Sequence, residues 1–82
     1  MQKNIDLVKK WLADPDSVSE EELIANDESA LSCYIEKDDH ISFCASYASS
    51  SALSNDPECA GHWVKEYEKN LKMESKNGTI FL

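Results

Sequence analysis

Two cysteine–histidine pairs are the residues whose types and spacing best suit metal chemistry. His40 and Cys44 are four residues apart, and Cys59 and His62 are three residues apart. Within a helix, each spacing places both side chains on one face. Two such pairs on facing helices would supply the four ligands of a tetrahedral zinc site. The spacing matches no zinc-finger pattern, and unligated cysteine is commonly buried. We therefore predict no metal site. A small metal- or thiol-dependent regulatory domain that uses these four residues is the alternative.

Nucleophilic catalysis is the second chemistry that these residues suggest. Any of the three cysteines beside either histidine would pair a thiol with a general base. The sequence offers no glycine-rich loop to hold an anion and no third residue placed to orient the base. We therefore predict a protein that is not an enzyme, with no catalytic residue and no cofactor.

The stretch from Asp14 to Glu58 is strongly acidic and forms the other candidate site. It contains twelve aspartates and glutamates and one basic residue, Lys37. Such a stretch is either a solvated surface or a surface that docks on a basic partner. In the second case it could take the place of DNA, which carries one charge per about 1.7 Å of axis. The residues predicted to bind a partner are Glu20, Glu21, Glu22, Asp27, Glu28, Glu36, Asp38 and Asp39.

Length and composition limit the remaining choices. The chain has 82 residues, a net charge of −8 and no arginine. This length predicts one acidic helical domain, residues 1–82, in which residues 76–82 form an apolar C-terminal tail. Direct binding of nucleic acid is not expected, because neutralising phosphate requires lysine and arginine. The sequence has neither an apolar run of about 18 residues nor a signal peptide, so we expect a cytoplasmic protein that binds no membrane.

Apolar periodicity and helix-boundary residues predict an all-α fold, a compact bundle of three or four short helices. A helix over 4–13 should be capped by Asn4 at its start and end before Pro15. A second should begin after Ser19, which forms a capping box with Glu22, and a third should span about 40–52 after an Asp38 or Asp39 cap. The last should begin at Pro57. The predicted core consists of Val8, Trp11, Leu12, Leu23, Leu31, Ile35, Ile41, Cys44, Ala48, Trp63, Val64 and Tyr67.

Two positions allow alternative interpretations. Asp27 falls within the apolar stripe of the second helix, between Leu23 and Leu31. We expect it at the edge of a wide stripe, and the alternative is a half-buried carboxylate with a raised pKa. Asn77-Gly78 should end the last helix or turn the chain. The apolar end, residues 80–82, should then fold back on the core, and the alternative is capture by a partner that reads C-termini.

Two segments carry a resemblance to a known group. Residues 11–23 and 63–68 resemble the two ends of small accessory proteins of tailed bacteriophages, an alanine-rich helical group of unknown function. The middle is similar in its small residues Ala45, Ala48 and Ala52. No activity or functional residue carries over from that group. The resemblance implies a phage-encoded inhibitor or modulator in the host cytoplasm. It would bind a host protein with a basic surface, such as a nucleic-acid-handling enzyme or a defence complex. A structural subunit of a larger assembly is a further alternative.

Overall fold

The fold is all-α, as predicted. The computed structural model describes the backbone of residues 1–81 and the side chains of residues 1–73. It contains the helices α1 (Gln2–Ala13), α2 (Glu20–Lys37), α3 (His40–Leu53) and α4 (Pro57–Phe81), with a short 3-10 helix, η1 (Pro15–Ser17), after α1. No strand occurs among residues 1–81. None of the described helices is both long and apolar enough to cross a membrane.

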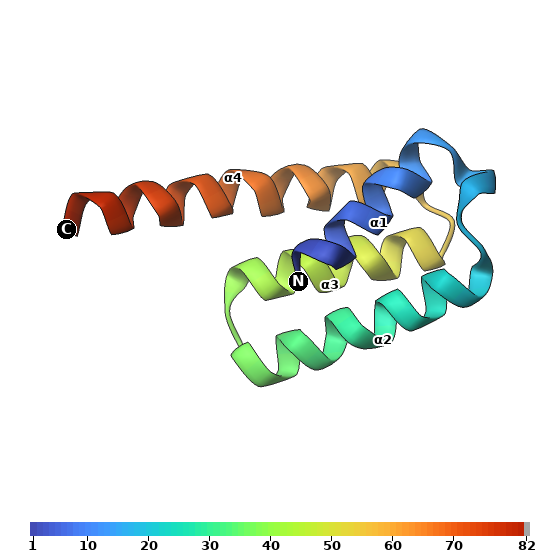
Figure 1. Ribbon diagram of the computed structural model, residues 1–82, viewed down its shortest axis with the longest axis horizontal. Helices are drawn as coiled ribbons and strands as arrows, with labels where there is room; N and C mark the ends of the chain where they lie inside the picture. The colour runs from blue at the N-terminus through green and yellow to red at the C-terminus, as the bar shows by residue number, and fades with distance from the viewer. Residues whose placement is uncertain (82) are drawn as a thin grey trace.

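Helix α3 lies at the centre of the bundle. It runs antiparallel to α2 on one side and to α4 on the other, and α1 crosses this layer obliquely (Figure 1). Small residues make this central position possible, because Cys44, Ala45, Ala48 and Ala52 of α3 are each at most 1% exposed. Short side chains let the neighbouring helix backbones approach α3 closely.

The helix boundaries follow the capping residues. Ser19 begins α2 with a capping box, in which its hydroxyl accepts from the Glu22 backbone N–H at 3.1 Å and its own backbone N–H donates to Glu22 at 3.2 Å. Of the two candidate caps of α3, Asp39 is the cap: its carboxylate accepts from the Ser42 backbone N–H at 2.8 Å. Asp38 ends α2 in the left-handed conformation, with a φ of 51°.

Asn4 is not the cap of α1, contrary to the prediction. It lies inside the helix, is buried, and donates to the side-chain oxygen of Asn26 on α2 at 2.8 Å. Asn26 in turn donates to the hydroxyl of Ser49 on α3 at 3.0 Å. This buried polar chain ties three helices together, and buried amides are tolerated only when they are paired in this way.

Ten of the twelve predicted core residues lie in the core or against it. Leu31 and Ile35 are exceptions, because their side chains are 46% and 71% exposed. The apolar stripe of α2 is wider than the surface that the bundle covers, so its outer edge remains in water. The buried apolar residues that the prediction omitted are Ile5, Val18, Ala30, Ala45, Ala52 and Ala60.

The prediction for the C-terminal end of the last helix is wrong. Helix α4 continues through Asn77-Gly78 to Phe81 instead of ending there. Its C-terminal end extends away from the other three helices rather than folding back on them (Figure 1). The molecule is therefore elongated, with extents of 43 × 25 × 17 Å. The side chains of the predicted tail lie outside the described residues.

Candidate functional site

The eight predicted partner-binding acids all lie on α2 or on the connection between α2 and α3. Seven of them are exposed, and Asp27 is partly buried. Among the described residues, the only ion pair joins Lys9 of α1 to Glu68 of α4, with 3.1 Å between the ammonium and carboxylate groups. None of the eight acids is therefore paired with a cation of its own chain in the described part of the structure.

These acids do not converge on one face. In a helix of 3.6 residues per turn, residues seven apart lie almost in line. Glu20 and Asp27 form a row on the α3 side of α2, and Glu21 and Glu28 form a second row that points outward. The helical repeat places Glu36 on the flank of α2 opposite to Glu20 and Asp27, closer to Glu22. The acids thus surround the solvent-facing side of α2.

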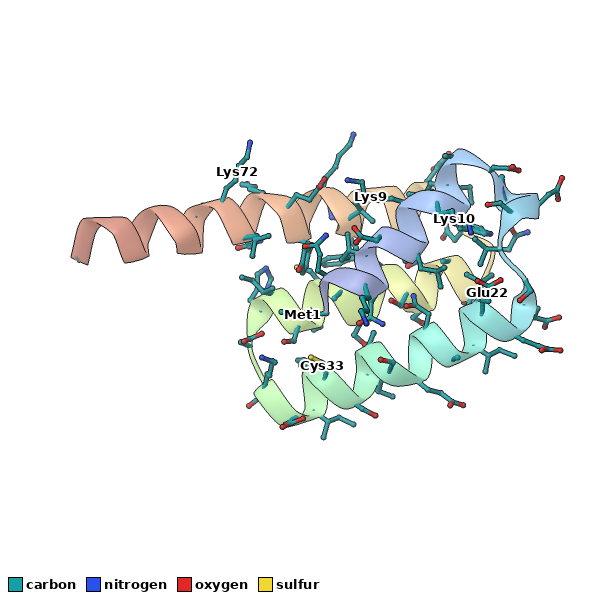
Figure 2. All side chains as sticks on the ribbon, viewed as in Figure 1. Met1, Lys9, Lys10, Glu22, Cys33 and Lys72 are labelled. Carbon is teal, nitrogen blue, oxygen red and sulfur yellow. The ribbon has the colours of Figure 1, made fainter. Side chains whose placement is uncertain are left out.

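Glu22 has a structural role in addition to its charge. It closes the capping box, and its carboxylate accepts from both the backbone N–H and the hydroxyl of Ser19, each at 3.2 Å. Hydrogen bonding from Ser19 lowers the pKa of Glu22, and the charge of Lys10 adds to this effect. Figure 2 shows Glu22 in the first turn of α2 and Lys10 on α1, above Glu22 in this view. A substitution of Glu22 would therefore disturb the helix start as well as the surface charge.

Asp27 lines a groove between α2 and α3. The groove has a volume of about 310 Å³ and is lined by Asp27, Leu31, Tyr34, Phe43, Ser46, Tyr47 and Ser50. Burial of the carboxyl raises the pKa of Asp27, and the neighbouring charge of Glu28 raises it further. Asp27 lies at the edge of the apolar stripe, as expected. It is also partly buried and its pKa is raised, so the structure supports the alternative of a half-buried carboxylate.

A second hollow of about 300 Å³ lies at the turn between α2 and α3. Its lining consists of Tyr34, Asp38, Asp39, His40 and Phe43. Hydrogen bonding from Ser42 lowers the pKa of Asp39, which keeps this carboxylate ionised at the rim. Because Tyr34 and Phe43 line both hollows, the two are neighbours along one face of the bundle.

Four aromatic residues form a cluster that the site prediction omitted: Tyr34, Phe43 and Tyr47 line the hollows, and Trp63 of α4 packs beside them. The Phe43 ring lies 5.5 Å from Tyr34, 4.6 Å from Tyr47 and 5.5 Å from Trp63, measured between ring centroids. The sequence carried a signal for this cluster. Phe43 and Tyr47 are four residues apart, so they share one face of the helix. The other residues of that face are serines, whereas the buried face carries alanines and a cysteine.

The alternative site formed by His40, Cys44, Cys59 and His62 does not assemble. The Cys44 thiol lies 3.7 Å from the nearer nitrogen of His40, but the Cys59 sulfur instead accepts from the Ser51 hydroxyl at 2.9 Å. His62 stands edge-on to Trp63 at 5.0 Å. Among the described residues, no three histidine, cysteine or acidic side chains are placed to share a metal ion.

The surroundings of Cys44 do not activate its thiol as a nucleophile. Burial raises the pKa of Cys44, and the charge of Glu66 raises it further. A raised thiol pKa reduces the fraction of thiolate, which is the reactive form. All three cysteines are free; Cys44 is buried, whereas Cys33 and Cys59 are partly buried.

Comparison with models of protein families, with curated proteins and with solved structures found no match to this chain. The described surface offers unpaired carboxylates on α2, and beside them an aromatic groove that contains one partly buried carboxylate. Both features suit the binding of cationic groups.

Proposed function

We propose that this protein is a non-enzymatic binding protein that docks its α2 carboxylates on a basic surface of a partner protein. The observation that carries the proposal is the absence of any ion pair between these acids and a cation of the described part of the chain. Unpaired exposed carboxylates are available to a partner. They also raise the rate at which an oppositely charged surface is encountered.

The spacing of the carboxylates bears on the kind of partner. Successive acids within one row are seven residues apart, which is about 10 Å along a helix. DNA carries one charge per about 1.7 Å, so these rows are much sparser than the phosphates of a duplex. The spacing favours contact with separate lysines and arginines on a protein over close mimicry of DNA.

The biological setting belongs to the same proposal. If the chain is encoded by a tailed bacteriophage, as its resemblance implies, the partner is a host protein and this protein inhibits or modulates it. A host enzyme or defence complex that handles nucleic acid has the required basic surface. Docking of the α2 carboxylates would then compete with the natural polyanion.

The test is capture of partners from a bacterial lysate by the tagged protein and by two matched variants. The double variant Glu21→Gln/Glu28→Gln removes two charges from the outward row of α2. The control, Asp16→Asn/Glu58→Gln, removes two exposed charges from η1 and from the first turn of α4. Each variant loses one glutamate from the first turn of a helix, so the effects on helix stability are comparable.

The proposal predicts a basic partner that the wild-type protein and the control retain and that the α2 double variant releases at lower salt. Equal retention by all three proteins would contradict it, because the α2 charges would then contribute nothing to binding. Glu22 is kept in both variants because it closes the capping box.

A further inference from the structure

The side of α3 that bears the aromatic cluster has no covering helix among the described residues. On this side of α3 the side chains that reach solvent are those of Phe43, Tyr47 and Ser50, which are spaced by four and three residues. Tyr47 is 47% exposed. Ser42 lies on a different side of α3 and donates to the sulfur of Met1 at the start of α1, at 3.2 Å. Helix α1 therefore covers one side of the layer, and the aromatic side is left open.

The two hollows on this open side form one trough, which we call the α2–α3 trough. It comprises the groove that contains Asp27 and the hollow that contains Asp38 and Asp39, and the rings of Tyr34 and Phe43 line both. Its floor is aromatic, and it has carboxylates at each end. Asp27 and Tyr34 are seven residues apart, so the groove extends over about two helical turns, or about 10 Å.

Aromatic rings beside a carboxylate suit one cationic group in particular. A cation over a ring face is attracted by the electrons of the ring. The planar guanidinium of arginine can stack on a ring and also form paired hydrogen bonds with a carboxylate, whereas the ammonium of lysine is a more strongly hydrated point charge. Asp27 has no hydrogen-bond donor among the described residues that would lower its pKa, so its carboxylate is free to accept from such a group.

We propose that the α2–α3 trough anchors an arginine-bearing amphipathic helix of the partner protein. One guanidinium lies on the Phe43 and Tyr47 rings and pairs with Asp27. Apolar residues of the incoming helix contact Leu31, which is 46% exposed. A second basic residue, about two turns along the incoming helix, reaches the carboxylates of Asp38 and Asp39. The inference rests on the proposed function and names the chemistry of the partner segment.

A second copy of this chain does not fit the trough. The chain contains no arginine, so it cannot supply the guanidinium. Its net charge of −8 also opposes association between copies. The docked helix would occupy the open side of α3 as a further helix of the bundle, which is a common mode of recognition for amphipathic helices.

The test uses the full chain and three synthetic amphipathic helical peptides that are identical except at two positions spaced by seven residues. These positions carry arginine, lysine or glutamine. Dissociation constants are measured by fluorescence anisotropy of labelled peptide at about 0.1 M salt. Stacking on the rings and pairing with Asp27 should make the arginine peptide bind about tenfold tighter than the glutamine peptide, with the lysine peptide between them.

Variants of the trough and of the outward row separate the inference from the proposed function. Asp27→Asn and Tyr47→Ala should each weaken binding of the arginine peptide by about tenfold. Tyr47→Phe keeps the ring and should retain binding. Asp16→Asn removes a charge from η1, and Glu21→Gln/Glu28→Gln removes the outward row. Asp16→Asn should change the affinity by less than about threefold, and the outward-row variant should weaken binding less than either trough variant does.

Three results would overturn the inference. One is an arginine peptide that binds no tighter than the glutamine peptide. Another is a loss that follows the outward-row variant and not the trough variants, in which case the proposed function stands and the trough is not its anchor. The last is a dimer of the unliganded protein, detected by sedimentation and disrupted by Tyr47→Ala, which would make a second copy the occupant. If the lysate experiment also shows no dependence on the α2 charges, the proposed function fails independently.

Discussion

The ring of Tyr47 on α3 stacks on the ring of Trp63 on α4, with centroids 5.1 Å apart and planes inclined by 29°. The contact packs Tyr47 against α4 and leaves 47% of the residue exposed. A ring that is packed by a neighbour yet exposed to solvent is a suitable contact surface, because the side chain loses less freedom on binding than an unsupported one would. The aromatic cluster therefore has both a packing role and a capacity for recognition.

The packing role predicts a modest effect of removing the ring. Tyr47→Ala loses the contacts with Phe43 and Trp63, and such aromatic pairs contribute about 0.5–1.5 kcal/mol each beyond the area that they bury. We expect the free energy of unfolding to fall by about 1–2 kcal/mol, as measured by urea denaturation, with helix content unchanged. Tyr47→Phe should be close to wild type. A Tyr47→Ala protein that fails to fold would show that the ring is a core element rather than a surface one.

Asp27→Asn should raise stability at neutral pH. Burial and then Glu28 raise the pKa of Asp27, so the folded protein holds this proton more strongly than the unfolded chain does. The stabilising contribution of Asp27 is present below its unfolded pKa and is lost as the pH rises through the folded pKa. The variant should therefore gain a few tenths of a kcal/mol at pH 7 and lose this advantage near about pH 3. A variant that is less stable than wild type at pH 7 would contradict the argument.

The caps of α2 and α3 should respond to pH in the opposite direction. Hydrogen bonding from Ser19 lowers the pKa of Glu22, and hydrogen bonding from Ser42 lowers the pKa of Asp39. Their contributions are present above the unfolded pKa values and are lost as the pH falls through the folded ones. Asp39→Ala should cost about 1 kcal/mol at pH 7 and much less in acid. The control Glu36→Ala alters an exposed acid near the same turn that caps no helix, and it should change the free energy of unfolding at pH 7 by no more than about 0.5 kcal/mol.

The buried amide pair should be the most sensitive polar position in the bundle. Asn26→Ala removes the 2.8 Å hydrogen bond from Asn4 and the 3.0 Å hydrogen bond to Ser49. Asn4 keeps a 3.3 Å bond to the backbone carbonyl of residue 26, and the Ser49 hydroxyl still donates to the carbonyl of Ala45. Each lost hydrogen bond contributes about 0.5–1.5 kcal/mol, so we expect the midpoint of thermal unfolding to fall by about 10 °C. Ser29→Ala, on the exposed side of α2, is the control and should shift the midpoint by no more than about 2 °C. Equal shifts for the two variants would show that the network does not stabilise the fold.

The helix starts were predictable from the sequence because they depend on local chemistry. Ser19 with Glu22, and Asp39 with Ser42, satisfy backbone groups within three residues, and proline restricts its own neighbourhood. Asn4 was misassigned because its partner, Asn26, is 22 residues away. The end of α4 was misassigned because Asn77-Gly78 favours a stop locally, whereas the helix continues to Phe81.

The site was also predictable only where it depends on residue type and not on contacts between distant parts of the chain. The sequence identified the acids of α2, since charge is read directly from residue type. It did not indicate that Asp27, and none of the other predicted acids within the helix, would line a groove, because this depends on α3 packing beside that flank of α2. Leu31 and Ile35 were assigned to the core because their spacing continues the apolar stripe, yet no described helix covers that side of α2. Periodicity gives the face of a helix, and only the packing of the neighbouring helices determines how much of that face is buried.

The most direct test of the central claim is the salt dependence of binding to the partner captured from lysate. Its dissociation constant is measured from about 0.05 to about 0.5 M salt for the wild type, for Glu21→Gln/Glu28→Gln and for Asp16→Asn/Glu58→Gln. Docking through the α2 carboxylates predicts that affinity weakens steeply with salt for the wild type and the control, and less steeply for the α2 double variant. An affinity that is independent of salt and equal for all three proteins would contradict the account, and would assign the acids to solvation alone.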